Sequence, residues 1–133
     1  MTNVFAPTVH DITHEFAREF QLETTALPLE PALLDMFVQE SRKLPAATWR
    51  AAFDVFIRSD ITSVLRAVTA PTLLIWGEYD SFSDRAEQER ILAAVPNSRL
   101  LEYKDTGHAV HWDRTERFAD DLAALTHEVA DVR

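Results

Sequence analysis

The fold of this chain is decided by the stretch from Pro71 to Asp113, which reads PTLLIWGEYDSFSDRAEQERILAAVPNSRLLEYKDTGHAVHWD. Its two apolar segments, Thr72–Trp76 and Arg99–Tyr103, predict β-strands, and residues 85–94 between them predict a helix. The first segment is apolar without alternation, which is typical of a parallel strand that is covered on both faces. Strand, helix and strand therefore predict a β-α-β unit with a right-handed crossover and an α/β fold class.

A polar residue follows each predicted strand. Asp80 comes three residues after Gly77, and His108 comes directly after Thr106 and Gly107, which we expect to form a sharp turn. The carboxyl ends of adjacent parallel strands meet at one edge of a sheet, so we expect this carboxylate and this imidazole to come within hydrogen-bonding reach. A carboxylate that orients a histidine base is two thirds of a catalytic triad, whose third member is a nucleophile.

Simpler interpretations of both residues stay open. Asp80 is also typical of a turn aspartate that caps residues 81–83, and His108 could be an exposed loop histidine. Asp84 and Glu78 are alternative acids, because they lie on the same predicted loop.

Composition excludes several classes of function. The net charge of −9 argues against binding to nucleic acid or to an anionic membrane surface, both of which favour lysine and arginine. The absence of cysteine excludes disulfides, thiolate metal ligands and a cysteine nucleophile. We see no signal-peptide pattern at residues 1–9 and no apolar run near the ~20 residues that span a bilayer, so the default expectation is a cytoplasmic protein.

The remainder of the chain predicts helices. Apolar residues at helical spacing, with prolines or polar caps between them, predict helices over residues 11–20, 30–43, 46–57 and 61–68, and a last helix from Asp113 or Thr115 to about residue 129. Ser59 or Asp60 is the expected cap of the fourth helix.

Two parallel strands do not make a plausible complete sheet. Parallel sheets need further strands and cover on both faces, and the segment Leu73–Ile75 would present an apolar edge to solvent. We therefore expect the chain to be part of a larger sheet.

The stretch from Pro71 to His108 resembles the α/β-hydrolase fold family. The features it shares are a proline-led strand that ends in Trp-Gly-Glu-x-Asp, at residues 71–80, and a second strand that ends in Gly-His, at Gly107 and His108. The resemblance extends over about residues 28–130 and implies a partial helical cap at residues 1–58 and the C-terminal portion of the hydrolase core at residues 59–133. It implies that Asp80 is the triad acid and His108 the triad histidine.

The sequence departs from the family pattern at the nucleophile. Family members carry it on a tight G-x-S-x-G turn earlier in the chain, and neither Gly77 nor Gly107 flanks a serine in that way. We therefore expect the chain to be a C-terminal fragment of the fold that is inactive alone. It should contain two parallel strands, flanking helices and a portion of the helical cap.

Four further residues are candidates for contact with substrate. The resemblance places Trp49 and Phe53 in the cap, although aromatic residues at helical spacing more often pack in a core, and His111 and Trp112 line the pocket or pack beneath it. The His-x-x-His spacing with Asp113 is reminiscent of a metal site, but no fourth ligand stands out and the segment is expected to be a turn. No metal or cofactor is therefore predicted.

The predicted function is hydrolysis of a small ester-like substrate by a complete nucleophile–histidine–acid triad. The missing nucleophile sets the reaction: a serine implies acyl transfer, whereas an aspartate implies dehalogenation or epoxide opening. The alternative is a non-catalytic binding or regulatory module that pairs through its open strand edge. Besides the small-molecule substrate, the expected partners are a second copy of the chain or the missing N-terminal half.

Overall fold

The computed structural model describes residues 11–131 of the 133-residue chain. Within this range the chain divides into two compact units, one formed by residues 11–23 and 28–60 and the other by residues 24–27 and 61–131. The short segment 24–27 thus lies between two helices of the first unit in the chain but packs with the second unit. No helix among the described residues is long and apolar enough to cross a membrane.

The first unit consists of the helices α1 (His14–Glu23), α2 (Pro31–Ser41) and α3 (Ala46–Arg58). The sequence explains where α2 begins: Pro31 needs no amide partner in the first turn, and the Glu30 carboxylate accepts hydrogen bonds from the two amides that follow it. Five buried apolar residues form its core: Ile12, Ala17, Leu34, Val38 and Ala46.

An aromatic cluster adjoins this core. Trp49 lies with its ring centre 5.9 Å from that of Phe16, 5.1 Å from that of Phe20 and 5.8 Å from that of Phe53. The Trp49 indole nitrogen donates a hydrogen bond to the Ser41 carbonyl at 3.1 Å. Trp49 and Phe53 are therefore held by packing within their own unit, and contact with a substrate stays a prediction.

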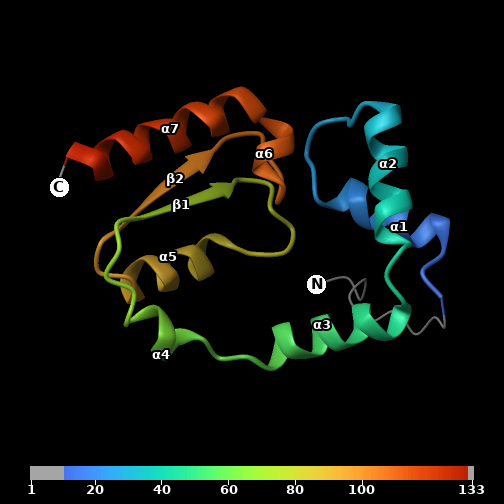
Figure 1. Cartoon of the computed structure of the whole chain (residues 1–133), viewed down its shortest axis with the longest axis horizontal. Coiled ribbons are helices and arrows are strands. Elements are labelled where there is room, and N and C mark those ends of the chain that lie inside the picture. The colour runs from blue at the N-terminus through green and yellow to red at the C-terminus, as the bar shows by residue number, and fades with distance from the viewer. Residues whose placement is uncertain (1–10, 132–133) are drawn as a thin grey trace. The chain divides into compact units, whose positions relative to one another are not determined.

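The second unit contains the β-α-β element. Its order is α4 (Thr62–Leu65), β1 (Thr72–Gly77), α5 (Arg85–Ala94), β2 (Ser98–Tyr103), α6 (Val110–Asp113) and α7 (Thr115–Asp131). The two strands pair in parallel, with Leu74 opposite Leu100, which confirms the predicted unit. Figure 1 shows the strands side by side, with α5 and α7 on opposite sides of the pair.

Local sequence fixes α5 between the strands. The Asp84 carboxylate accepts a hydrogen bond from the Glu87 amide, and the Glu87 carboxylate accepts one from the Asp84 amide, a reciprocal pair that satisfies two otherwise unpaired helix-terminal donors. At the other end Val95 is buried, and the Ser98 hydroxyl donates to its carbonyl at 2.7 Å. The chain is thereby turned directly from α5 into β2.

Three expectations about helix boundaries are wrong. Helix α1 begins at His14 and not at residue 11, because the Thr13 hydroxyl accepts a hydrogen bond from the Phe16 amide and so caps the helix there. The N-cap position of α4 is Ile61 and not Ser59 or Asp60, and the Ser59 hydroxyl donates back to the Val55 carbonyl at the end of α3. The segment around His111, expected to be a turn, is the short helix α6.

Candidate active site

The two strand ends are packed together through the only two glycines of the chain. A Cβ atom on Gly77 would lie 2.1 Å from the Gly107 carbonyl oxygen and 2.4 Å from that of Thr106. A Cβ atom on Gly107 would lie 2.7 Å from the backbone nitrogen of Ala26. Three backbone segments therefore stack in direct contact at the carboxyl ends of the strands, and only glycine permits that approach.

Gly107 does not turn the chain after β2, contrary to expectation. The left-handed backbone conformation after β2 is found at Asp105, with a φ of 50°, whereas neither glycine of the chain has a positive φ. Aspartate tolerates this conformation better than most residues. Gly107 is therefore required for close packing, and Asp105 turns the chain.

Hydrogen bonds join the loop after β1 to the loop after β2. Beyond the last paired residues, the Glu78 amide donates to the Tyr103 carbonyl and the Tyr79 amide donates to the Thr106 carbonyl, each at 2.9 Å. Thr106 is fully buried, and its hydroxyl donates to the Lys104 carbonyl at 2.8 Å. The loops that carry Asp80 and His108 are thus fixed to one another and not only to their own strands.

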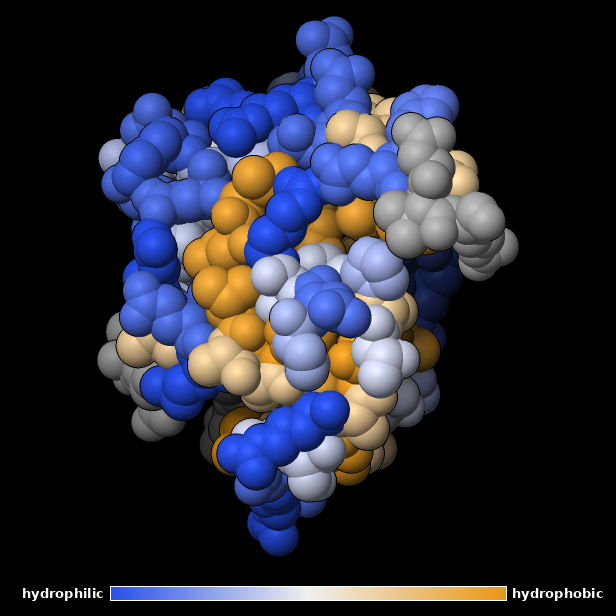
Figure 2. Space-filling view, turned by 90° about the vertical axis from the view of Figure 1, so that its left-hand side faces the viewer, coloured by the Kyte–Doolittle hydropathy of each residue, from blue (hydrophilic) through white to orange (hydrophobic). Residues whose placement is uncertain are grey.

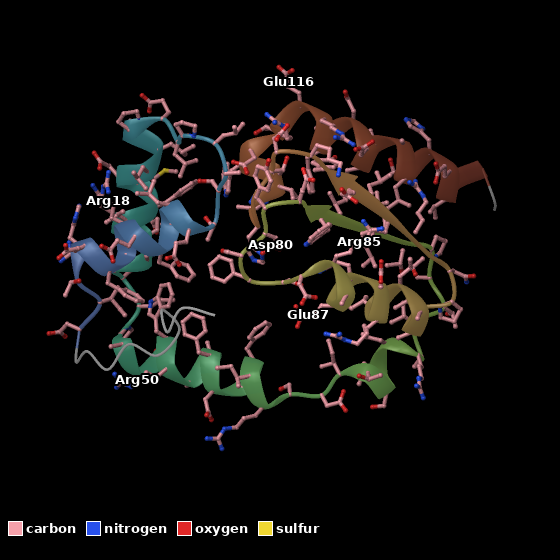
Figure 3. All side chains as sticks on the ribbon, turned by 180° about the vertical axis from the view of Figure 1, so that it is seen from behind. Arg18, Arg50, Asp80, Arg85, Glu87 and Glu116 are labelled. Atoms are coloured by element: carbon pink, nitrogen blue, oxygen red, sulfur yellow. The ribbon has the colours of Figure 1, made fainter. Side chains whose placement is uncertain are left out.

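Asp80 uses its two carboxylate oxygens for two different tasks. Oδ1 accepts hydrogen bonds from the amides of Phe82 and Ser83 at 2.8 and 3.1 Å, which is the turn-capping interpretation. Oδ2 lies 2.9 Å from Nδ1 of His108, which is the contact expected of a triad acid. Only 6% of the side chain of Asp80, which Figure 3 labels, is exposed.

His108 is half exposed beside this carboxylate. Its side chain is 49% exposed, and its ring centre lies 4.9 Å from that of Phe82. The hydrogen bond with Asp80 raises the pKa of His108 above its usual value, against an opposing effect of burial. Because Nδ1 faces Asp80, Nε2 is the nitrogen that is left to exchange a proton with a reacting group.

The alternative acids have other partners. The Glu78 carboxylate forms an ion pair with Lys104 at 3.0 Å, and the Asp84 carboxylate caps α5. Of the three candidates, only Asp80 contacts His108.

His111 and Trp112 lie on α6, and each contacts an aromatic neighbour. The His111 ring centre lies 4.9 Å from that of Trp112 and 5.9 Å from that of Phe118. Burial and the neighbouring His108 lower the pKa of His111 below its usual value. Their contact with substrate stays a prediction.

Asp113 is the residue whose importance the sequence did not reveal. It was interpretable as a helix cap or as a metal ligand beside His111, but its carboxylate is buried and accepts three backbone hydrogen bonds. Two of the three donors lie more than 80 residues away in the chain, at Ala26 and Leu27, so no local pattern points to this contact.

The Asp80→Asn substitution is expected to lower the pKa of His108. The carboxylate is the largest cause that raises this pKa, and without it only the opposing effect of burial remains. The pKa should then fall from above to below the usual value of about 6.5. An NMR titration of the histidine ring signals measures the change, with Asp84→Asn as the matched control that removes a carboxylate outside the pair. A pKa that is the same in Asp80→Asn and wild type would show that the contact is not maintained in solution.

Comparison with known families identifies the fold. The family model described as the alpha/beta hydrolase fold matches residues 12–115, which is most of the described chain. The chain belongs to the α/β-hydrolase fold family. The matched range includes both strands and the two loops whose residues Asp80 and His108 are in contact.

Two relatives illustrate the range of proteins in which this part of the α/β-hydrolase fold occurs. The 2-hydroxy-6-oxononadienedioate/2-hydroxy-6-oxononatrienedioate hydrolase 2 of Pseudomonas putida is 31% identical over 118 residues, which cover 89% of this chain and 37% of the relative. The polyketide synthase ThaQ of Burkholderia thailandensis is 33% identical over 91 residues, which cover 68% of this chain and 4% of the relative. The chain therefore spans well under half the length of these relatives.

Solved structures share the fold at lower sequence identity. A putative aryl esterase from Burkholderia cenocepacia matches with a TM-score of 0.84 and 18% identity over 98% of this chain and 49% of its own. The enol-lactonase from Burkholderia xenovorans LB400 matches with a TM-score of 0.76 and 17% identity over 86% of this chain and 45% of its own. At these identities the likeness concerns the fold.

Proposed function

We propose that this chain supplies the acid and the base of a nucleophile–histidine–acid triad that hydrolyses a small ester-like substrate. The observation that carries the proposal is the 2.9 Å contact between Asp80 Oδ2 and His108 Nδ1, held by two loops that are hydrogen-bonded to each other. The supporting comparisons are the family itself and the Pseudomonas putida relative, which is named as a hydrolase.

The proposal gives each of the two residues its own step. His108 accepts the proton of the nucleophile through Nε2 and returns it to the leaving group, while its Nδ1–H donates to Asp80. Asp80 holds the ring in the tautomer that this transfer requires and stabilises the imidazolium that forms. With its second oxygen bound to two amides, Asp80 cannot turn away from the ring without losing those bonds.

The nucleophile is proposed to come from polypeptide outside these 133 residues. The two glycines stand 30 positions apart, at residues 77 and 107, so the chain holds no G-x-S-x-G turn. Whether that nucleophile is a serine or an aspartate decides between acyl transfer and dehalogenation or epoxide opening.

The open edge of β1 is the proposed docking site for that polypeptide. Among the described residues β1 pairs only with β2. The amides of Thr72 and Glu78 donate toward β2, and backbone groups alternate along a strand, so those of Leu73 and Ile75 point to the opposite, unpaired edge.

The edge of β1 is better suited to pairing than that of β2. All residues of β1 are uncharged, whereas β2 carries Arg99, paired with Glu128, and Glu102, paired with Arg85 and Lys104. Charged side chains are a common way to protect an edge strand from association. Figure 2 shows hydrophobic residues gathered in the middle of one face of the molecule, surrounded by hydrophilic ones.

Proline substitutions test the edge. The isolated chain is expected to form dimers or larger species at micromolar concentration, because an apolar strand edge is uncovered. Leu73→Pro removes an amide from the open edge only and should reduce this association while β1 still pairs with β2. The matched control is Leu74→Pro, which removes an amide on the β2 side and should disrupt the fold. Light scattering and circular dichroism measure both results, and a clean wild-type monomer would contradict the proposed edge.

A further inference from the structure

Asp113, the last residue of α6, has a buried carboxylate that binds three backbone amides. Its Oδ2 accepts hydrogen bonds from Gly107 at 2.6 Å and from Ala26 at 2.8 Å, and its Oδ1 accepts one from Leu27 at 3.2 Å. The residue is 8% exposed. A carboxylate is the strongest acceptor a side chain offers to backbone amides, and burial makes the loss of any of these bonds costly.

These bonds surround the backbone that carries His108. Gly107, directly before it, donates to Asp113, and Ala109, directly after it, donates to the Thr24 carbonyl at 2.6 Å. Ala109 is therefore bonded directly, and Gly107 through the Asp113 carboxylate, to one short segment, residues 24–27, which packs with this unit. The histidine reaches Asp80 from a backbone that is held on each side.

The Asp113 carboxylate is the group that joins the parts. Residues 24–27 form no helix or strand that would hold them in place, and Gly107 leaves no side chain between its backbone and theirs. Two of their amides and the Gly107 amide converge on one carboxylate. The loop of His108, the segment 24–27 and α6 thus meet at the Asp113 carboxylate.

We propose that Asp113 is a positioning residue for His108, fixing through the Gly107 amide the backbone from which the imidazole reaches Asp80. The inference rests on the proposed function, since a proton-transferring histidine must be held in place for the reaction. Asp113 does not touch the reacting atoms itself.

The test is Asp113→Asn, which keeps the size of the side chain but replaces one acceptor oxygen with an amino group. The amino group cannot accept an amide hydrogen bond, so at least one of the three donors loses its partner. The loop should loosen, the contact with Asp80 should weaken, and the pKa of His108 should move down toward its usual value in an NMR titration. Fused to the N-terminal part of a relative, the variant should lose roughly 100-fold in kcat with little change in KM.

Two control variants separate positioning from general stability. Glu116→Gln makes the same chemical change on an exposed carboxylate three residues further on and should leave the pKa of His108 unchanged. Val95→Ala destabilises the buried end of α5, which precedes β2 whereas the His108 loop follows it, and it too should leave this pKa unchanged. A folded Asp113→Asn chain in which His108 titrates as in wild type would overturn the inference.

The readouts also distinguish this inference from the proposed function. If the fused enzyme is inactive but the pKa of His108 falls in Asp113→Asn, the proposed function fails and the positioning role stands.

If Asp113→Asn does not fold, hydrogen exchange of the wild-type chain decides. The amides of Gly107, Ala26 and Leu27 should then be protected from exchange to a similar degree as the amides of β1. Exchange of these three amides at the rates of an unfolded chain would overturn the inference.

Discussion

His108→Ala is expected to abolish the proposed hydrolysis by a completed form of this chain. The complete form is a fusion of the N-terminal part of the Pseudomonas putida hydrolase, up to the start of its matching region, with this chain. Without the imidazole no group is placed to take the proton from the nucleophile, and the remaining members of a triad do not act independently. Asp80→Asn should reduce kcat by about 10⁴-fold, as in the serine-protease precedent, because the histidine is then held in the wrong tautomer.

A chromogenic short-chain ester is the first substrate for this assay, followed by a haloalkane and an epoxide. The unfused chain should not exceed the rate of free imidazole, and His127→Ala, which removes an exposed histidine of α7, should retain the activity of the fusion. Activity that survives His108→Ala would refute the assignment of the site. A folded fusion that is inactive on all three substrates would favour the alternative of a binding module.

The β-α-β unit and the Asp80–His108 contact were predictable because each depends on a rule that a short stretch of sequence reveals. An uninterrupted apolar run predicts a covered parallel strand, and parallel strands bring their carboxyl ends together. Two residues 28 positions apart, Asp80 and His108, are thereby placed side by side without any knowledge of the rest of the chain. Thr106 and Gly107 predict a sharp turn, but in the structure Asp105 turns the chain and the two glycines permit close packing.

The role of Asp113 was not predictable for the opposite reason. Its partners are backbone amides in a distant segment without regular structure, and a backbone amide leaves no mark in the sequence. Periodicity likewise predicts α3 but not the cover of its apolar residues, among them Phe56 and Ile57. Those side chains are 78% and 69% exposed in the structure, because periodicity defines a helix face but not what covers it.

Gly77→Ala is expected to destabilise the second unit strongly. The new methyl group would lie 2.1 Å from the Gly107 carbonyl oxygen and 2.8 Å from the Thr106 carbonyl carbon, where the obstructing atoms are backbone and cannot rotate away. Relief requires the loops after β1 and β2 to separate, which breaks the bond from Tyr79 to Thr106. We expect a loss of about 3 kcal/mol or more in the free energy of unfolding, at the upper end of what overpacking costs.

Gly107→Ala provides a graded comparison with Gly77→Ala. Its methyl group would meet the segment 24–27 at 2.7 to 3.0 Å, and that segment has no strand to hold it, so it can shift and the loss should be smaller. Ala93→Ser, on the exposed side of α5, should stay within about 0.5 kcal/mol of wild type. Chemical unfolding followed by circular dichroism measures all three. A Gly77→Ala chain as stable as wild type would show that the loops after β1 and β2 are not in contact. The contact between Asp80 and His108, which depends on these two loops, would then be in doubt as well.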